Sequence, residues 1–91
     1  MELRWTEKAA DDLERITDYL FEKTPERAAE LVRSIYAAPT ALLTFPRRGR
    51  PGKRVGTREL VLTPLPYILV YRITGNVIQI ARILHGAQNR S

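Results

Sequence analysis

Most of the side chains that could bind an anionic partner or take part in a reaction lie in residues 45–91. This half holds nine lysines and arginines and one acid, Glu59. Residues 1–44 hold six lysines and arginines and nine acids, so the net charge of +5 divides into −3 and +8. Such a division directs anionic partners to the basic half. We therefore expect the basic half to be the working surface. Its candidate partner-binding or phosphate-binding residues are Arg50, Lys53, Arg54, Arg58, Arg72 and Arg82.

His85 is the single histidine of the chain and could act as an acid or a base near neutral pH. The sequence places no second titrating side chain beside it. A lone histidine at a strand end more often hydrogen-bonds the local backbone than catalyses a reaction. We therefore expect a structural role for His85 and keep a catalytic role as the alternative. One histidine, no cysteine and carboxylates confined almost wholly to residues 1–44 give no basis for a metal site or a cofactor.

Length and composition limit the class of protein. The 91 residues suffice for a single domain, residues 1–91, with a modest core. The absence of cysteine excludes disulfides and fits a reducing compartment. The N-terminus has no apolar segment typical of a signal peptide, and no apolar run approaches the ~20 residues that a membrane span needs. We expect a soluble cytoplasmic protein without membrane contact.

A short strand and a helix are predicted at the N-terminus. Leu3 and Trp5 alternate with polar residues, which indicates a strand. Thr6 is a good N-cap, and apolar residues at helical spacing predict a helix over residues 6–23. The apolar stripe consists of Ala9, Leu13, Ile16 and Leu20, and the acids Asp11, Asp12, Glu14, Asp18 and Glu22 are assigned mostly to the opposite face.

A second helix is predicted to begin at Thr24, which offers a capping hydroxyl, with Pro25 at the first helical position. Almost no loop separates the two helices, so we expect them to form an antiparallel hairpin. Pro39 lies inside the second apolar pattern, where it removes a backbone hydrogen bond. We therefore expect a kink or break near Ala38.

The second half of the chain reads as a loop followed by three strands. Residues 46–57 combine glycines, prolines and five cationic side chains, which is typical of a loop. Strands are predicted over 58–63, 67–73 and 77–84, with a tight turn at 74–76. Consecutive strands with short links pair antiparallel. The expected fold class is α+β: an N-terminal strand and a helical hairpin packed on a small antiparallel sheet, in the order β-α-α-β-β-β.

Strand alternation assigns side chains to two faces of this sheet. We expect the bulkier sets to pack against the helices, and these are Tyr67, Leu69, Tyr71 and Ile73 with Ile78, Ile80, Arg82 and Leu84. The open face then carries Ile68, Val70, Ala81 and Ile83 beside Arg72, Gln79 and His85. An apolar centre with a cationic rim commonly marks a protein contact. The alternatives are cover by the six residues after His85, which can bury little area, or by a dimer mate.

The sequence at this point resembles RelE/ParE-type toxins of type II toxin–antitoxin modules, which are also known as plasmid stabilisation proteins. The resemblance covers nearly the whole chain, including the helical hairpin and the loop with Phe45-Pro46 and Gly49-Arg50-Pro51-Gly52. Its most specific parts are the strand with Tyr67, Tyr71 and Arg72 and the ending His85-Gly86-Ala87-Gln88. The fold that it implies agrees with the element order above.

The resemblance implies one of two activities. RelE-like members cleave mRNA in the ribosomal A site, whereas ParE-like members poison DNA gyrase. RNA cleavage through the 2′-hydroxyl needs a base, an acid and cations for the charged phosphorane. Where RelE-like members carry strand lysines, an arginine after the middle-strand tyrosine, a loop glutamate or a tyrosine after the histidine, this chain has Glu59 and Val61, Ile68, Gly52 and Gly86.

Only His85 remains of that apparatus, since arginine has a pKa above about 12 and is a poor proton donor. The resemblance therefore favours the ParE branch and a growth inhibitor that is not an enzyme. A ribosome-dependent endoribonuclease (an mRNA interferase) is the alternative. A module that has lost toxicity and only binds its partner is a further one.

The resemblance also implies a cognate antitoxin that keeps the toxin inactive, with assembly as a homodimer or as a heterotetramer with the antitoxin. An acidic amphipathic segment suits the open face, with apolar anchors on Ile68, Val70 and Ile83 and carboxylates on the arginines. We expect strand arginines to contribute more than loop arginines, because loop side chains lose more entropy when a partner orders them. The strand set is Arg58, Arg72 and Arg82, and the loop set is Arg47 and Arg48.

Overall fold

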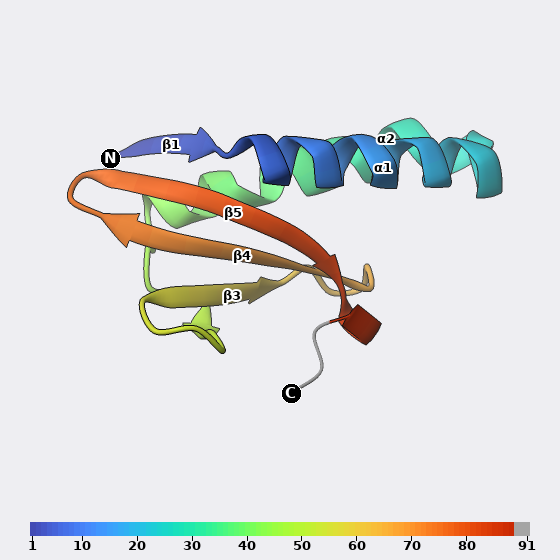
Figure 1. Cartoon of the computed structure of the whole chain (residues 1–91). Helices are drawn as coiled ribbons and strands as arrows, with labels where there is room; N and C mark the ends of the chain where they lie inside the picture. Colours follow the sequence, from blue (N-terminus) through green and yellow to red (C-terminus); the bar gives the residue numbers. More distant parts are fainter. Residues whose placement is uncertain (89–91) are drawn as a thin grey trace.

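The computed structural model describes residues 1–88. Strand β1 (Glu2–Trp5) leads into helix α1 (Glu7–Lys23), helix α2 (Pro25–Ala37) and the 3-10 helix η1 (Ala38–Leu43). The strands β2 (Arg50–Pro51), β3 (Thr57–Val61), β4 (Tyr67–Thr74) and β5 (Val77–His85) follow, and a 3-10 turn η2 (Gly86–Gln88) closes the described part. Figure 1 shows α1 continuing the line of β1, with α2 behind α1 and the green segment of η1 behind β5. This confirms the expected α+β architecture.

The helices begin and end where the sequence predicts. Thr6 caps α1 by accepting a hydrogen bond from the backbone N–H of Ala9 at 3.0 Å. Pro25 occupies the start of α2, but the Thr24 hydroxyl donates to the Glu26 carboxylate instead of capping the helix, so that part of the prediction is wrong. The predicted break lies at Ala38, where α2 passes into η1. Within residues 1–88, no helix is long and apolar enough to cross a bilayer.

The five strands form one sheet in the order β1-β5-β4-β3-β2. The three predicted strands are confirmed as the antiparallel set β3, β4 and β5, and Gly75 provides the positive φ of +58° in the turn between the last two. Two features go beyond the prediction. Strand β1 pairs with β5 in parallel, and two residues of the predicted loop form β2 and pair with β3.

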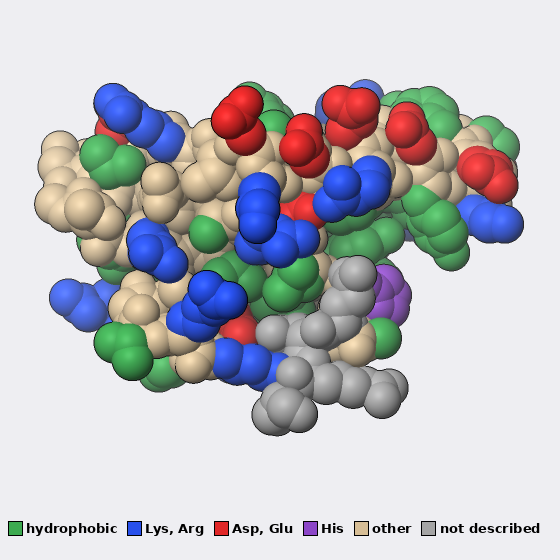
Figure 2. All heavy atoms as spheres, in the orientation of Figure 1, with side chains coloured by type: hydrophobic (Ala, Val, Ile, Leu, Met, Phe, Trp, Pro, Cys, Tyr) green, Lys and Arg blue, Asp and Glu red, His purple; other side chains and the backbone are tan. Residues whose placement is uncertain are grey.

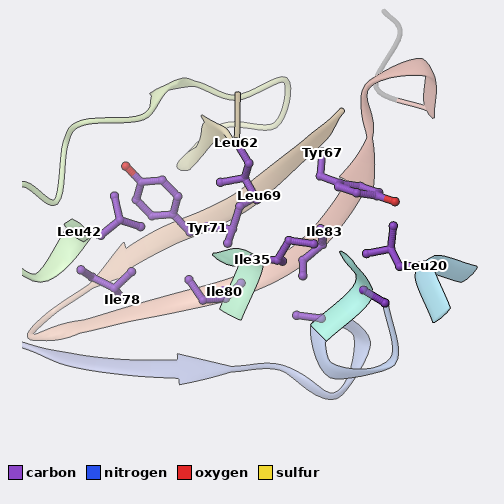
Figure 3. Packing of buried hydrophobic residues seen from close by; sticks show 12 residues of the cluster. Leu20, Ile35, Leu42, Leu62, Tyr67, Leu69, Tyr71, Ile78, Ile80 and Ile83 are labelled. Carbon is purple, nitrogen blue, oxygen red and sulfur yellow. The ribbon is translucent and has the colours of Figure 1, made fainter. Parts of the chain in front are cut away.

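The core lies between the sheet and the helices. Leu69, Tyr71, Ile78 and Ile80 are fully buried, and Figure 3 shows them packed with side chains from the helical layer, including Ile35. Tyr67 of β4 also belongs to this cluster. The assignment of the β4 tyrosines and Leu69 to the helix side is therefore confirmed.

The assignment of the second half of β5 is wrong. Val70 pairs with Arg82, but the next residue, Tyr71, pairs with Ile80, so Ala81 is an extra residue that forms a β-bulge. Every side chain beyond the bulge changes face. Ile83 consequently lies in the core, only 3% exposed, while Arg82 and Leu84 belong to the opposite face with Val70 and Ile68.

Candidate functional site

The open face of the sheet carries the cationic side chains that the sequence singles out. Residues that pair directly across strands share a face, so one row runs Arg50, Glu59, Val70, Arg82 and another runs Thr57, Arg72, Gln79. Figure 2 shows Lys and Arg side chains over the strands and Asp and Glu side chains in a row along α1. The division of charge in the sequence is thus a division between two layers of the molecule.

Arg82 is held at the edge of β5 by an acid from α1. Its Nε lies 2.8 Å and its Nη2 3.1 Å from the two carboxylate oxygens of Asp12, which is 4% exposed. The same carboxylate accepts the backbone N–H of Ile83 at 2.9 Å and a guanidinium N–H of Arg15 at 2.6 Å. The Thr6 hydroxyl donates to the Ala81 carbonyl at 3.0 Å. Side chains of the α1 segment therefore complete the β5 edge beyond the point where β1 ends.

Asp12 is charged in this environment. Burial disfavours its ionised form, but the hydrogen bonds from Arg82 and Ile83, with the charges of Arg82 and Arg15, hold the pKa of Asp12 below its ordinary value. The sequence analysis assigned Asp12 to the solvent face of α1, which is wrong. A signal was available, because Asp12 stands three residues after Ala9 and four before Ile16, on the apolar stripe itself.

Arg58 is used to fix the loop before β2. Its Nη1 donates to the Gly49 carbonyl at 2.6 Å and to the Arg47 carbonyl at 3.3 Å. The fully buried Tyr71 acts on the same segment, since its hydroxyl donates to the Pro46 carbonyl at 2.6 Å and accepts the Gly49 N–H at 2.9 Å. The close approach requires glycine, because a Cβ on Gly49 would lie 2.7 Å from the Tyr71 ring. The loop is therefore pinned to the sheet.

The remaining predicted cations differ in their surroundings. Arg50 donates to the buried Glu59 carboxylate at 3.0 Å, so the acid of the basic half already has a cation beside it. Arg72 and Arg54 are exposed, and neither guanidinium has a hydrogen bond or ion pair within residues 1–88. Lys53 is exposed in the loop between β2 and β3. Of the three strand arginines, Arg72 alone has no hydrogen bond or ion pair within the part of the chain that the structure describes.

His85 ends β5 and is exposed. Its Nδ1 accepts the backbone N–H of Ala87 at 3.1 Å, and its ring meets the Tyr67 ring edge-on at 5.8 Å. The bond from Ala87 places the proton of the neutral ring on Nε2. This is the local backbone contact that the structural interpretation of His85 predicts.

A cleft of about 540 Å³ opens beside Tyr67, between the far end of the helical hairpin and the start of β4. Ile16, Leu20, Leu31 and Leu65 provide its apolar walls, and Arg15, Arg82, Tyr19 and His85 stand at its polar edges. Burial raises the pKa of Tyr67, with a smaller contribution from Tyr19. The Tyr67 hydroxyl has no hydrogen bond to any described residue, so this cleft offers apolar surface, the phenols of Tyr67 and Tyr19 and two guanidinium groups to a partner. Sequence reasoning missed the cleft, since it forms only where the hairpin extends past the sheet.

The three predicted apolar contacts are divided by the bulge. Ile68 and Val70 lie on the open face, where Ile68 is 7% exposed and Val70 is half-buried, whereas Ile83 is in the core. The prediction that the chain end after His85 leaves this face uncovered also concerns residues 89–91, which lie outside the described residues. Residues 1–88 contain no group of three or more His, Asp or Glu side chains that could hold a metal ion.

Comparison with known proteins gives a consistent set of relatives. Residues 3–90 match the family model described as the ParE toxin of the type II toxin–antitoxin system parDE. The chain is 42% identical over 86 residues to Y4kP of Sinorhizobium fredii, a protein named as a toxin, covering 94% of this chain and 88% of Y4kP. It is 34% identical over 84 residues to toxin RelE2 of Caulobacter vibrioides, covering 92% and 93% of the two chains.

A solved structure agrees with these relatives. A chain of the chromosomal ParDE toxin–antitoxin system from P. aeruginosa superposes with a TM-score of 0.85 at 36% identity. The match covers 93% of this chain and 95% of that one. The fold and the sequence relationship therefore identify the same family.

Proposed function

The chain belongs to the ParE toxin family of type II toxin–antitoxin systems, and we propose that it inhibits growth by poisoning DNA gyrase while a cognate antitoxin keeps it inactive. Two findings support the choice of target. The matching family model is that of ParE, and the P. aeruginosa ParDE chain is similar in both fold and sequence. The proposed activity is a protein–protein inhibition, not a chemical reaction of the toxin itself.

The observation that carries the proposal is that, apart from Arg72, the arginines and the histidine of strands β2 to β5 already have partners within the fold. Arg58 binds loop carbonyls, Arg82 binds Asp12 and Arg50 binds Glu59. His85 accepts a backbone N–H through Nδ1. A ribonuclease needs an acid, a base and free cations that converge on one phosphate. Within residues 1–88, Arg15 and Arg82 line the same cleft as His85, but both guanidinium groups are bound to Asp12.

A ribosome-dependent endoribonuclease is the second candidate. RelE2 of Caulobacter vibrioides is 34% identical to this chain, and His85 lines the cleft with the ring of Tyr67 edge-on to it. In that case His85 would be the acid or the base, and its replacement would abolish activity. The two candidate functions therefore predict different effects of His85→Ala on activity.

We propose the cleft beside Tyr67 as the binding site for the antitoxin. Its apolar walls suit the apolar stripe of an amphipathic helix, and Arg15 and Arg82 at its edge suit carboxylates beside that stripe. Ile83 lines this cleft and does not share the open face with Ile68 and Val70, so it belongs to the proposed contact as part of the cleft wall. Arg72 remains a candidate contact on the open face.

Induction of the chain in growing cells tests the proposal. Gyrase poisoning should cause filamentation and a DNA-damage response while translation continues, and purified chain should inhibit supercoiling by purified gyrase. His85→Ala should leave both effects intact. Arrested translation with mRNA cut at ribosomes, abolished by His85→Ala, would establish the nuclease instead. Unaltered growth would indicate a module that only binds its partner.

A further inference from the structure

The segment of residues 45–49 combines an immobile backbone with exposed side chains. The Phe45 N–H donates to the Ala41 carbonyl at 3.0 Å, and the Arg48 N–H closes a turn onto the Phe45 carbonyl at 3.1 Å. The carbonyls of Pro46, Arg47 and Gly49 and the Gly49 N–H are bound by Tyr71 and Arg58 as described above. Nearly every backbone polar group of the segment thus has a fixed partner.

The side chains on this fixed backbone point outward. Phe45 is 64% exposed, and both Arg47 and Arg48 are exposed. Neither arginine side chain forms a hydrogen bond or an ion pair with the residues that the structure describes. An exposed aromatic ring is unfavourable in water, and such a ring beside two unpaired guanidinium groups is typical of an interface anchor.

A shallow cup of about 710 Å³ lies beneath these side chains. Met1 and Ile73 form its apolar floor together with Phe45, and Arg47 and Arg48 stand beside it. We name these five residues the pinned-loop surface. It adjoins the end of β4 opposite to Tyr67. The six residue steps from Tyr67 to Ile73 separate it from the cleft by about 20 Å at the rise of an extended strand.

We propose that the pinned-loop surface binds the target protein of the toxin, through an acidic segment that places one apolar side chain in the cup and carboxylates on Arg47 and Arg48. The proposal rests on the growth inhibition proposed above, but not on gyrase as the target. A partner that docks here pays little ordering entropy, because the loop backbone is already fixed. The distance from the cleft separates target binding from antitoxin binding.

The proposal ranks Arg47 and Arg48 above Arg58 and Arg82, opposite to the expectation from the sequence. Strand arginines were expected to contribute more than Arg47 and Arg48, since loop side chains must be ordered by a partner. In the structure Arg58 and Arg82 are bound within the fold, and Arg58 itself fixes the loop that presents Arg47 and Arg48. The loop pair is therefore the better prepared for a partner.

A binding experiment tests the surface without reference to toxicity. A short synthetic peptide of aspartates and glutamates around one leucine is titrated into the isotope-labelled full chain, and amide shifts are followed by NMR. The shifts should centre on Phe45, Arg47, Arg48 and Ile73. The triple variant Phe45→Ser, Arg47→Glu, Arg48→Glu should bind at least about tenfold more weakly. Shifts elsewhere, or none, would overturn the proposal, as would tighter binding of a single-stranded oligonucleotide at these residues.

A growth experiment tests whether this surface meets the target. The triple variant should lose growth inhibition while its unfolding midpoint stays unchanged. The control variant Phe21→Ser, Lys8→Glu, Arg33→Glu removes one exposed aromatic ring and the same charge from the helical layer, and it should remain toxic. Equal toxicity of the triple variant and the unmodified chain would overturn the proposal. An unmodified chain that does not inhibit growth would refute the proposed function, and the peptide titration would still decide the surface.

Discussion

Two tyrosines on one face of β4 end in opposite situations. Tyr71 is fully buried, and its hydroxyl both donates to and accepts from the backbone of the loop before β2. Tyr67 stands four residues earlier, is 5% exposed, and has a hydroxyl without a hydrogen bond to any described residue. Figure 3 shows the two hydroxyls pointing toward opposite ends of the sheet. Both tyrosines lie on the helix side of β4 by strand alternation. Tyr71 nevertheless fills its end of the molecule, whereas a cleft remains beside Tyr67.

Two glycines show the same difference in packing between the end of the sheet at Tyr71, the closed end, and the end at Tyr67, the open end. A Cβ on Gly49 would lie within 3.0 Å of the ring and hydroxyl of Tyr71 and of the Glu59 carbonyl, whereas a Cβ on Gly86 would meet only the Pro66 carbonyl, at 3.6 Å. The closed end is therefore packed to its limit, and the open end has spare room. This suggests that folding stability depends most on the closed end and binding on the open end and on the outer side of the pinned loop.

Gly49→Ala should have the largest effect on stability. The new methyl group meets the Tyr71 ring and a backbone carbonyl, neither of which can move without breaking the loop contacts, so we expect a loss of about 4 kcal/mol. Urea denaturation gives the free energy of unfolding. Gly86→Ala is the matched change at the open end and should cost less than about 0.5 kcal/mol. Equal losses at the two glycines would refute the contrast between the ends.

Asp12→Ala should be the next most damaging change, because Asp12 holds one wall of the cleft. It leaves the Ile83 N–H without its partner and removes the buried charge that binds Arg82. We expect a loss of about 3 kcal/mol in the free energy of unfolding. The neighbouring exposed acid provides the control, and Asp11→Ala should change stability by less than about 0.5 kcal/mol. A small effect of Asp12→Ala would mean that β5 does not depend on α1 for its edge.

Removing single hydroxyls compares the two tyrosines directly. Tyr71→Phe leaves the Gly49 N–H and the Pro46 carbonyl unpaired, which should cost about 2 kcal/mol. Tyr67→Phe breaks no hydrogen bond to a described residue and should be neutral within about 0.5 kcal/mol. If the cleft binds the antitoxin, Tyr67→Phe instead weakens that complex, which calorimetric titration measures. A stability loss at Tyr67 equal to that at Tyr71 would remove the distinction.

The pH dependence of stability should give the smallest effect. The pKa of Asp12 is lower in the folded chain than in the unfolded chain, so its contribution is complete above the unfolded value and is lost as pH falls through the folded one. Stability should therefore decline below about pH 4, the pKa range of an unperturbed aspartate. The decline should be shallower in Asp12→Asn, which lacks the titrating group. Identical pH profiles from pH 7 to pH 2 would show that Asp12 does not contribute.

The sequence predicted what depends on local pattern and missed what depends on long-range geometry. The helix starts, the break at Ala38 and the burial of Tyr67 and Tyr71 follow from spacing, capping and proline chemistry, and all were predicted. The bulge at Ala81 has no local signal, because alternation in a strand looks the same with or without an extra residue. That one residue moved Ile83 into the core and Arg82 onto the open face.

Long-range geometry also decides which of the candidate cations are bound within the fold. A count of arginines locates the basic half correctly, but it does not tell which guanidinium groups the fold uses for itself. Arg58 and Arg82 are bound by groups that are distant in sequence, the Gly49 carbonyl and Asp12. Asp12 was the partial exception, since its place on the apolar stripe of α1 was visible beforehand.

The parallel pairing of β1 with β5 has a consequence for how the protein is made. Thr6 and Ala81, joined by a hydrogen bond, lie 75 residues apart, so the first strand has no neighbour until the last one has been synthesised. Contacts of such sequence separation slow folding and cannot form on a growing chain. A ribosome that stops anywhere before β5 therefore releases a fragment whose sheet cannot assemble. The surfaces of the folded chain therefore form only after β5 has been translated.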